Sequence, residues 1–149
     1  MKKFLSLTLA LSLGLSAAIA NPFPAAGNKF NEALKYSFAG AEIISWKSVR
    51  NTGLQQAAFY LNNQRFHAYY NESAQLVATV RFVQASNLPL HIHQSITGNY
   101  SGCAVTEVAE MVQNGITEFY ITIQHNNKEI MLRADEKGML KNIYSKKIN

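Results

Sequence analysis

Residues 57–70 read AAFYLNNQRFHAYY, and this stretch predicts a β-hairpin. Apolar side chains recur at every second position on both sides of Asn62-Asn63, which is the period of a half-buried strand. Asparagine tolerates the positive φ that a two-residue hairpin turn needs, so we expect the chain to reverse at this pair. The predicted inward positions are Ala57, Phe59 and Leu61 before the turn and Phe66, Ala68 and Tyr70 after it.

The same pattern returns 64 residues later, around Asn126-Asn127. Phe119, Ile121 and Ile123 alternate before this second turn, and Ile130 and Leu132 alternate after it. Each hairpin has one further predicted strand on either side, so each half of the chain should contain four antiparallel strands. The added strands are residues 42–49 and 76–83 in the first half and residues 104–112 and 139–146 in the second.

A helix is predicted ahead of each set of strands. Phe30, Leu34 and Phe38 recur at helical spacing before Gly40, and Ile92, Ile96 and Tyr100 do so 62 residues later before Gly102. Such a stripe followed by glycine is typical of a helix that ends in a glycine C-cap. Asn28 is the expected N-cap of the first helix, and Pro89 is expected in the opening turn of the second.

These elements predict an α+β fold made of two tandem helix-plus-antiparallel-strand repeats, residues 28–85 and 86–149. One helix could hardly cover a separate four-stranded sheet, so we expect the strands to join in one sheet with both helices on the same face. The opposite face of the sheet is then left open to solvent.

The N-terminus has the pattern of a cleavable signal peptide, residues 1–20. Lys2 and Lys3 precede about sixteen uncharged residues, and Ala18-Ile19-Ala20 places small residues at a cleavage site. The alternative is an uncleaved anchor, but a membrane span needs roughly 20 apolar residues. The sequence therefore predicts a periplasmic or extracellular protein whose mature chain, residues 21–149, is one domain without a transmembrane segment.

Net charge does not favour nucleic acid as a partner. The chain has a charge of +5, which falls to about +3 once the two lysines of the predicted signal are removed. The one local cluster, Lys137, Lys141, Lys146 and Lys147, has no basic and aromatic residues interleaved around it. A solvated basic edge is the better interpretation, although a binding patch is the alternative.

No catalytic residues, metal site or cofactor are predicted. His91 and His93 could bind a metal together on a strand, but on the predicted helix they point about 200° apart. His67 and His125 lack an acidic or cysteine partner at metal-binding spacing. The single cysteine, Cys103, cannot form an internal disulfide, and its apolar neighbourhood favours a buried structural thiol over a reactive one.

The order of these features resembles the PepSY-like family, small exported proteins with a beta-lactamase-inhibitor-protein-like fold. The resemblance rests on Phe38-Ala39-Gly40, the strand with Trp46, Ala58-Phe59-Tyr60 before Asn-Asn, Tyr69-Tyr70-Asn71, and Leu88-Pro89 opening a helix. The turn Asn71-Glu72-Ser73-Ala74 departs from the family's usual form, which residues 135–138, Asp-Glu-Lys-Gly, match. The resemblance implies a binding module that grips a protein on the sheet face away from its helices, and it implies no catalytic residues.

The open sheet face is therefore the predicted binding surface. Tyrosine, methionine and arginine are enriched at protein interfaces, and the positions that alternate with the core contain all three. The candidates are Tyr60, His67, Tyr69, Thr122, Gln124, Met131 and Arg133, with Arg81 on the neighbouring strand. The alternative is an ordinary solvated sheet face.

Three functions are compatible with the sequence. The first is an exported protein-binding or inhibitor-like module, whose partner is an extracytoplasmic protein. The second is a periplasmic small-ligand sensor or carrier, which would need an apolar pocket between helices and sheet. The third is an enzyme that uses Cys103 or a histidine, for which the sequence contains no recognisable nucleophile setting.

Overall fold

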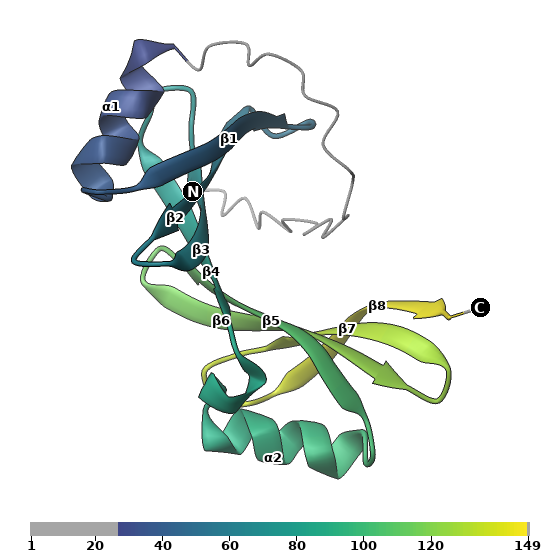
Figure 1. Ribbon diagram of the computed structural model, residues 1–149. Helices are drawn as coiled ribbons and strands as arrows, with labels where there is room; N and C mark the ends of the chain where they lie inside the picture. Colours follow the sequence, from purple (N-terminus) through teal and green to yellow (C-terminus); the bar gives the residue numbers. More distant parts are fainter. Residues whose placement is uncertain (1–26, 149) are drawn as a thin grey trace, which may run out of the picture.

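A computed structural model of the chain describes residues 27–148, and the predicted signal peptide lies outside this range. Each of two helices is followed by four strands, and one short 3-10 helix precedes the second (Figure 1). The elements are α1 (Asn28–Ser37), β1 (Glu42–Val49), β2 (Leu54–Leu61), β3 (Gln64–Tyr70), β4 (Leu76–Val83), η1 (Ala85–Asn87), α2 (Leu90–Asn99), β5 (Ala104–Gln113), β6 (Ile116–His125), β7 (Lys128–Ala134) and β8 (Leu140–Lys147).

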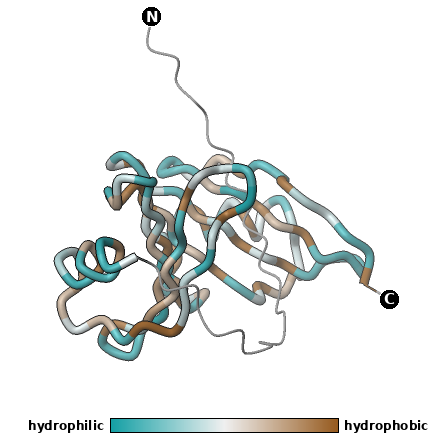
Figure 2. Tube along the Cα trace, turned by 90° about the horizontal axis from the view of Figure 1, so that it is seen from above, coloured by the Kyte–Doolittle hydropathy of each residue, from teal (hydrophilic) through white to brown (hydrophobic). Residues whose placement is uncertain are grey.

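The eight strands form one antiparallel sheet in chain order, so the predicted α+β fold with a single sheet is confirmed. Asn62 and Asn63 have φ values of 52° and 61°, and Asn126 and Asn127 have 49° and 57°, as expected for two-residue turns. A third turn of this kind, Asn114-Gly115, joins β5 to β6 and was not predicted. Alternating hydrophobic and hydrophilic residues along the strands are visible in Figure 2.

The helices form where predicted, but their ends differ from the expectation. Gly27, not Asn28, is the N-cap residue of α1, and no side chain caps that end. The helix ends at Ser37, before Gly40 is reached, so the expected glycine C-cap is wrong. Gly40 instead has a φ of +83° in the turn where the Ala41 N–H donates to the Phe38 carbonyl at 3.1 Å. Its positive φ redirects the chain into β1.

Both helices lie on the same face of the sheet. Phe66, which packs beside α1, pairs with Arg81, and Arg81 pairs with Glu110. Glu110 in turn pairs with Phe119, which packs beside α2. Because cross-strand partners point to the same face, this row places α1 and α2 on one side, here called the helix side. Figure 1 shows each helix covering a different end of the sheet.

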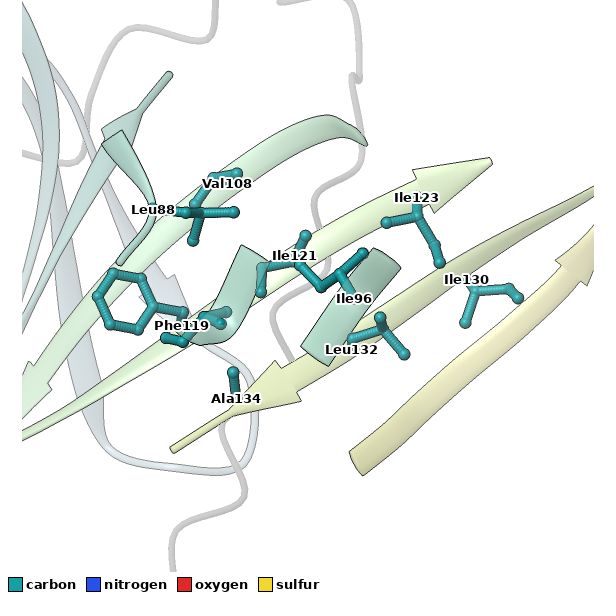
Figure 3. Packing of buried hydrophobic residues seen from close by; sticks show 10 residues of the cluster. Leu88, Ile96, Val108, Phe119, Ile121, Ile123, Ile130, Leu132 and Ala134 are labelled. Atoms are coloured by element: carbon teal, nitrogen blue, oxygen red, sulfur yellow. The ribbon is translucent and has the colours of Figure 1, made fainter. Parts of the chain in front are cut away.

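Each helix is held by its own apolar cluster. Phe30 and Leu34 of α1 pack on the inward residues of β2 and β3, including Phe59 and Tyr70, as the alternation predicts. The cluster under α2 is drawn in Figure 3, and its members are Leu88, Ile92, Ile96, Val108, Phe119, Ile121, Ile123, Ile130, Leu132 and Ala134. Cys103 is half-buried at the edge of this second cluster, so the expectation of a fully buried thiol is wrong.

The turns after β3 and β7 have the same hydrogen bonds although one lacks glycine. Asn71 Oδ1 accepts from the N–H groups of residues 73 and 75, and Asp135 Oδ1 accepts from those of residues 137 and 139. The residue at the left-handed position is Ala74, with a φ of 58°, in the first turn and Gly138, with a φ of 80°, in the second. Alanine is strained in this conformation, whereas glycine is not.

Replacing Ala74 with glycine should therefore raise the free energy of unfolding by about 0.5–1 kcal/mol, measured by urea unfolding. The gain is the relief of left-handed strain, reduced by the greater freedom of glycine in the unfolded chain. Gly138→Ala is the matched reverse change and should lower stability, since an added Cβ would also lie 2.8 Å from His91 Cδ2. A loss of stability in Ala74→Gly would contradict the explanation.

Within residues 27–148, neither helix combines the length and hydropathy that crossing a membrane would take.

Candidate functional site

The face opposite the two helices, here called the helix-free face, is the side of the sheet that no helix covers. Its side chains alternate with the residues that pack under α1 and α2. The centre of this face is not solvated but closed by a third apolar cluster, whose buried members are Leu54, Tyr69, Ala78, Val80, Ala109, Met111 and Tyr120. Polar groups that could contact a partner are therefore displaced toward the margins of the face.

A polar network on β2 and β3 borders this apolar centre. Gln56 Nε2 lies 2.7 Å from His67 Nδ1 and donates to the Tyr69 hydroxyl at 3.1 Å. All three side chains are buried, and burial raises the pKa of Tyr69 to about 12. The network satisfies polar atoms that would otherwise be costly beside an apolar cluster.

His67 is neutral over the physiological pH range. Burial lowers the pKa of the imidazole to about 4, and the positive charges of Arg65 and Lys47 act in the same direction. A neutral imidazole accepts at one nitrogen only, and the short contact with Gln56 assigns that role to Nδ1. The Nε2 atom then holds the proton, and it faces Arg65 Nη2 at 3.3 Å.

Arg65 is held at the exposed margin of the face by aromatic contacts. Its guanidinium carbon lies 5.0 Å from the centre of the Phe82 ring, a cation–π arrangement. The same ring meets His67 edge-on, with centroids 5.0 Å apart and planes at 74°. Tyr60, the cross-strand partner of Arg65, is 43% exposed. Arginine and aromatic side chains thus form a contiguous exposed margin.

The other half of the face is organised around Glu118. The Tyr120 hydroxyl donates to Glu118 Oε2 at 3.2 Å, and Arg133 Nη1 lies 3.6 Å from Glu118 Oε1. Burial, followed by the neighbouring Glu118 charge, raises the pKa of Tyr120. Burial also raises the pKa of Glu107 on β5, against the opposing effect of Arg65. Arg133 is consequently a compensated cation.

The predicted binding residues do not form one patch. Tyr60 and Gln124 are exposed, Thr122, Met131 and Arg133 are half-buried, and His67 and Tyr69 are buried. Tyr69 belongs to the apolar centre and reaches no solvent-facing position. These residues lie on the helix-free face as expected, at opposite margins of the closed centre.

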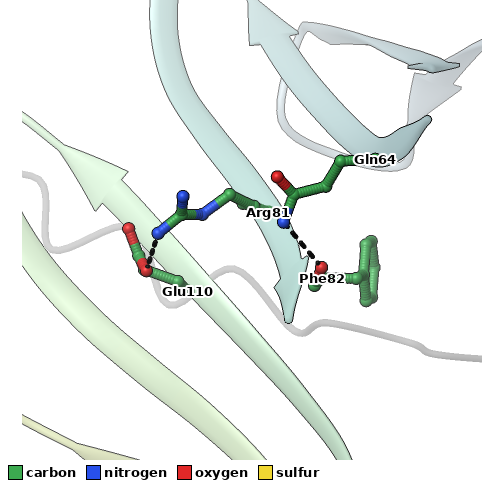
Figure 4. A network of polar contacts seen from close by, with 4 residues as sticks. All are labelled: Gln64, Arg81, Phe82 and Glu110. Carbon is green, nitrogen blue, oxygen red and sulfur yellow. Dashed lines mark hydrogen bonds and ion pairs between the residues drawn. The ribbon is translucent and has the colours of Figure 1, made fainter. Parts of the chain in front are cut away.

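Arg81 is the exception, since its predicted place on the helix-free face is wrong. It lies on the helix side, where Nη2 donates to Glu110 Oε2 at 2.6 Å (Figure 4). Behind it, Gln64 Nε2 donates to the Phe82 carbonyl at 3.2 Å. Arg81 therefore ties β4 to β5 between the two helices, at the junction of the two halves of the sheet.

Arg65, Phe82, Glu118 and Tyr120 are site residues that the sequence did not predict. The signal for Arg65 was available, because it alternates with the inward residues Phe66 and Ala68 just as His67 does. Phe82 had no such signal, since the face of β4 depends on its pairing with β3. The structure thus moves attention from the buried tyrosine to the arginine at the margin.

The histidines outside this face do not assemble a metal centre in residues 27–148. His91 and His93 lie on α2, where side chains two apart diverge, as predicted. His91 Nε2 lies 3.0 Å from the Glu136 carbonyl, which ties α2 to the turn before β8. The chemistry on the helix-free face is that of hydrogen-bond donors and aromatic surface, which suits binding.

No known family profile matches the sequence, and no curated protein matches it. The fold, however, is shared with solved structures. A BLIP-like protein from Bacteroides fragilis superposes with a TM-score of 0.65 at 20% identity, over 80% of this chain and 84% of the other. A DUF2874 family protein from Bacteroides uniformis gives 0.70 at 16% identity, over 82% and 89%.

A third similar structure is that of a Bacteroides eggerthii protein provisionally assigned to the periplasm. It superposes with a TM-score of 0.69 at 16% identity, over 78% of this chain and 88% of the other. Identities this low establish similarity of fold and not of activity. The chain therefore has a BLIP-like fold, one antiparallel sheet with two helices, which agrees with the fold implied by the sequence resemblance.

Proposed function

We propose that this chain is an exported, non-catalytic module that binds an extracytoplasmic protein through the helix-free face. The observation that supports this most directly is the margin of Tyr60, Arg65 and Phe82 beside an apolar centre on a sheet face that neither helix covers. Aromatic and arginine side chains around an apolar surface are typical of protein interfaces. The shared fold with a BLIP-like protein supports the same role.

The proposal includes export by the predicted signal peptide, residues 1–20, and a mature chain, residues 21–149, that is one PepSY-like domain. The order of one helix and four strands, found twice at offsets of 62 and 64 residues, supports an origin by tandem repetition. One structure with this fold is provisionally assigned to the periplasm, which supports a periplasmic or extracellular location. An inhibitor or regulator of an enzyme is the finer form of this proposal.

The alternative, a small-ligand carrier, is less well supported. It would need an apolar cavity between a helix and the sheet. Ile92 and Ile96 of α2 instead pack on Ile121 and Leu132 of the sheet, and all four side chains are almost completely inaccessible (Figure 3). Close packing of this kind leaves no room for a ligand without displacing core side chains.

Affinity capture from an envelope extract, read by quantitative mass spectrometry, tests the proposed binding face. The double variant Tyr60→Ala, Arg133→Glu should recover the specific partner about tenfold less than the parent chain, since both side chains lie on the helix-free face. Tyr36→Ala is the matched control, because Tyr36 is 94% exposed on α1. Equal recovery by the double variant and the parent would rule out this face as the binding surface.

A further inference from the structure

We propose that Arg65 and the Nε2–H of His67 form a carboxylate-binding site, which receives an Asp or Glu side chain of the partner protein. The inference rests on the proposed binding function and specifies the chemistry of the partner. It starts from two donors that face each other. Arg65 Nη2 lies 3.3 Å from His67 Nε2, and both atoms hold protons once Nδ1 accepts from Gln56.

Two donors at this separation cannot satisfy one another. An oxygen acceptor in front of them could receive a hydrogen bond from each, and a carboxylate offers two such oxygens. The imidazole is oriented for this by Gln56 on its inner edge, while its Nε2 edge points toward exposed Arg65. Phe82 supports both groups from below, through the cation–π contact and the edge-on ring contact. The donors are therefore positioned before a ligand arrives.

Charge at this margin also favours an anion. Arg65 takes part in no ion pair with a carboxylate of residues 27–148. Lys47, on the neighbouring strand β1, adds a second positive charge near His67. Glu107 is close enough to respond to the Arg65 charge, yet the two do not form a salt bridge. Arg133 differs, because Glu118 already compensates it.

Small side chains leave space at the site. Ala58 is the cross-strand partner of His67, and Ala109 is the cross-strand partner of Phe82. An alanine on each side of the ring pair lets an approaching side chain reach the donors without displacing a bulky neighbour. The planar fork of arginine matches a carboxylate, and a single neutral imidazole donor supplements it. We therefore assign the occupant as an acidic side chain of a protein.

The test is an NMR titration of the ¹⁵N-labelled protein, purified from the exported fraction, with a hexaglutamate peptide at neutral pH. Saturable shifts of the Arg65 side chain and the His67 Nε2 resonance are expected, with a Kd on the order of 1 mM. Hexaglutamine, which has the same length without charge, should leave both resonances unchanged. Inorganic phosphate is the second probe and should bind more weakly than the peptide.

Arg65→Gln should weaken hexaglutamate binding about tenfold, whereas Arg133→Gln should change it less than about twofold. Equal effects of the two variants would overturn the site, as would equal binding of hexaglutamine, tighter binding of phosphate or no shift at Arg65. A fold check by amide spectra accompanies each variant. If partner capture still depends on Tyr60 and Arg133 while hexaglutamate binding fails, the carboxylate site is refuted and the proposed binding face survives.

Discussion

Ile96→Ala should lower the free energy of unfolding by about 3–4 kcal/mol, because it truncates one of the two side chains that anchor α2 to the sheet. Ile96 is 1% exposed and, with Ile92, is one of the two buried residues of α2. Its side chain lies against the sheet residues of the second cluster, as Figure 3 shows. Truncation removes buried apolar surface and leaves a cavity that a helix held by two anchors cannot readily close.

Leu90→Ala is the matched control for this prediction. Leu90 begins the same helix but is 71% exposed, so its truncation should change stability by less than about 0.5 kcal/mol. Chemical denaturation monitored by circular dichroism measures both variants under one set of conditions. Similar losses in the two variants would contradict the assigned packing of α2.

Lowering the pH from about 6.5 to about 4 should destabilise the protein through His67. Burial and the charges of Arg65 and Lys47 lower the pKa of the folded-state imidazole to about 4, against an ordinary value of 6.5. In this window the unfolded chain binds a proton that the folded chain does not, so stability falls as the pH falls. The loss should reach about 2 kcal/mol after allowing for solvent screening, and it should level off below pH 4.

His67→Gln should remove this part of the pH dependence, because glutamine retains a polar group and does not titrate. His93→Gln, at an exposed position of α2, should preserve it. The measurement is urea unfolding at a series of pH values, with an NMR titration of the imidazole as a direct check. Titration of His67 above pH 6, or an unchanged slope in His67→Gln, would refute the role assigned to burial.

Local chemistry explains why much of the fold could be predicted. The Asn62-Asn63 and Asn126-Asn127 turns have backbone angles that few other residues accept, so they locate the hairpins without tertiary information. Strands β1 and β4 begin and end at the predicted residues, since alternation and turn residues lie within each segment. The helix ends were less predictable, because neither α1 nor α2 has a side-chain cap.

The candidate site could be predicted only in part. Tyr60, His67 and Met131 were assigned to the correct face by alternation within a strand. Arg81 was assigned to the wrong face, because the register of β3 and β4 shifts between Tyr69 and Tyr70. An irregularity of this kind changes which residues of the next strand face the core, and the sequence of either strand alone does not reveal it.

The sequence by itself determined the order of helices and strands, the main hairpin turns and the apolar stripe of each helix, since each depends on neighbours within a few residues. Tertiary structure alone decided that Tyr69 is buried, that Arg81 is on the helix side, and that Arg65 meets His67 above Phe82. Those outcomes depend on register and on packing between strands, where side chains distant in sequence compete for the same space.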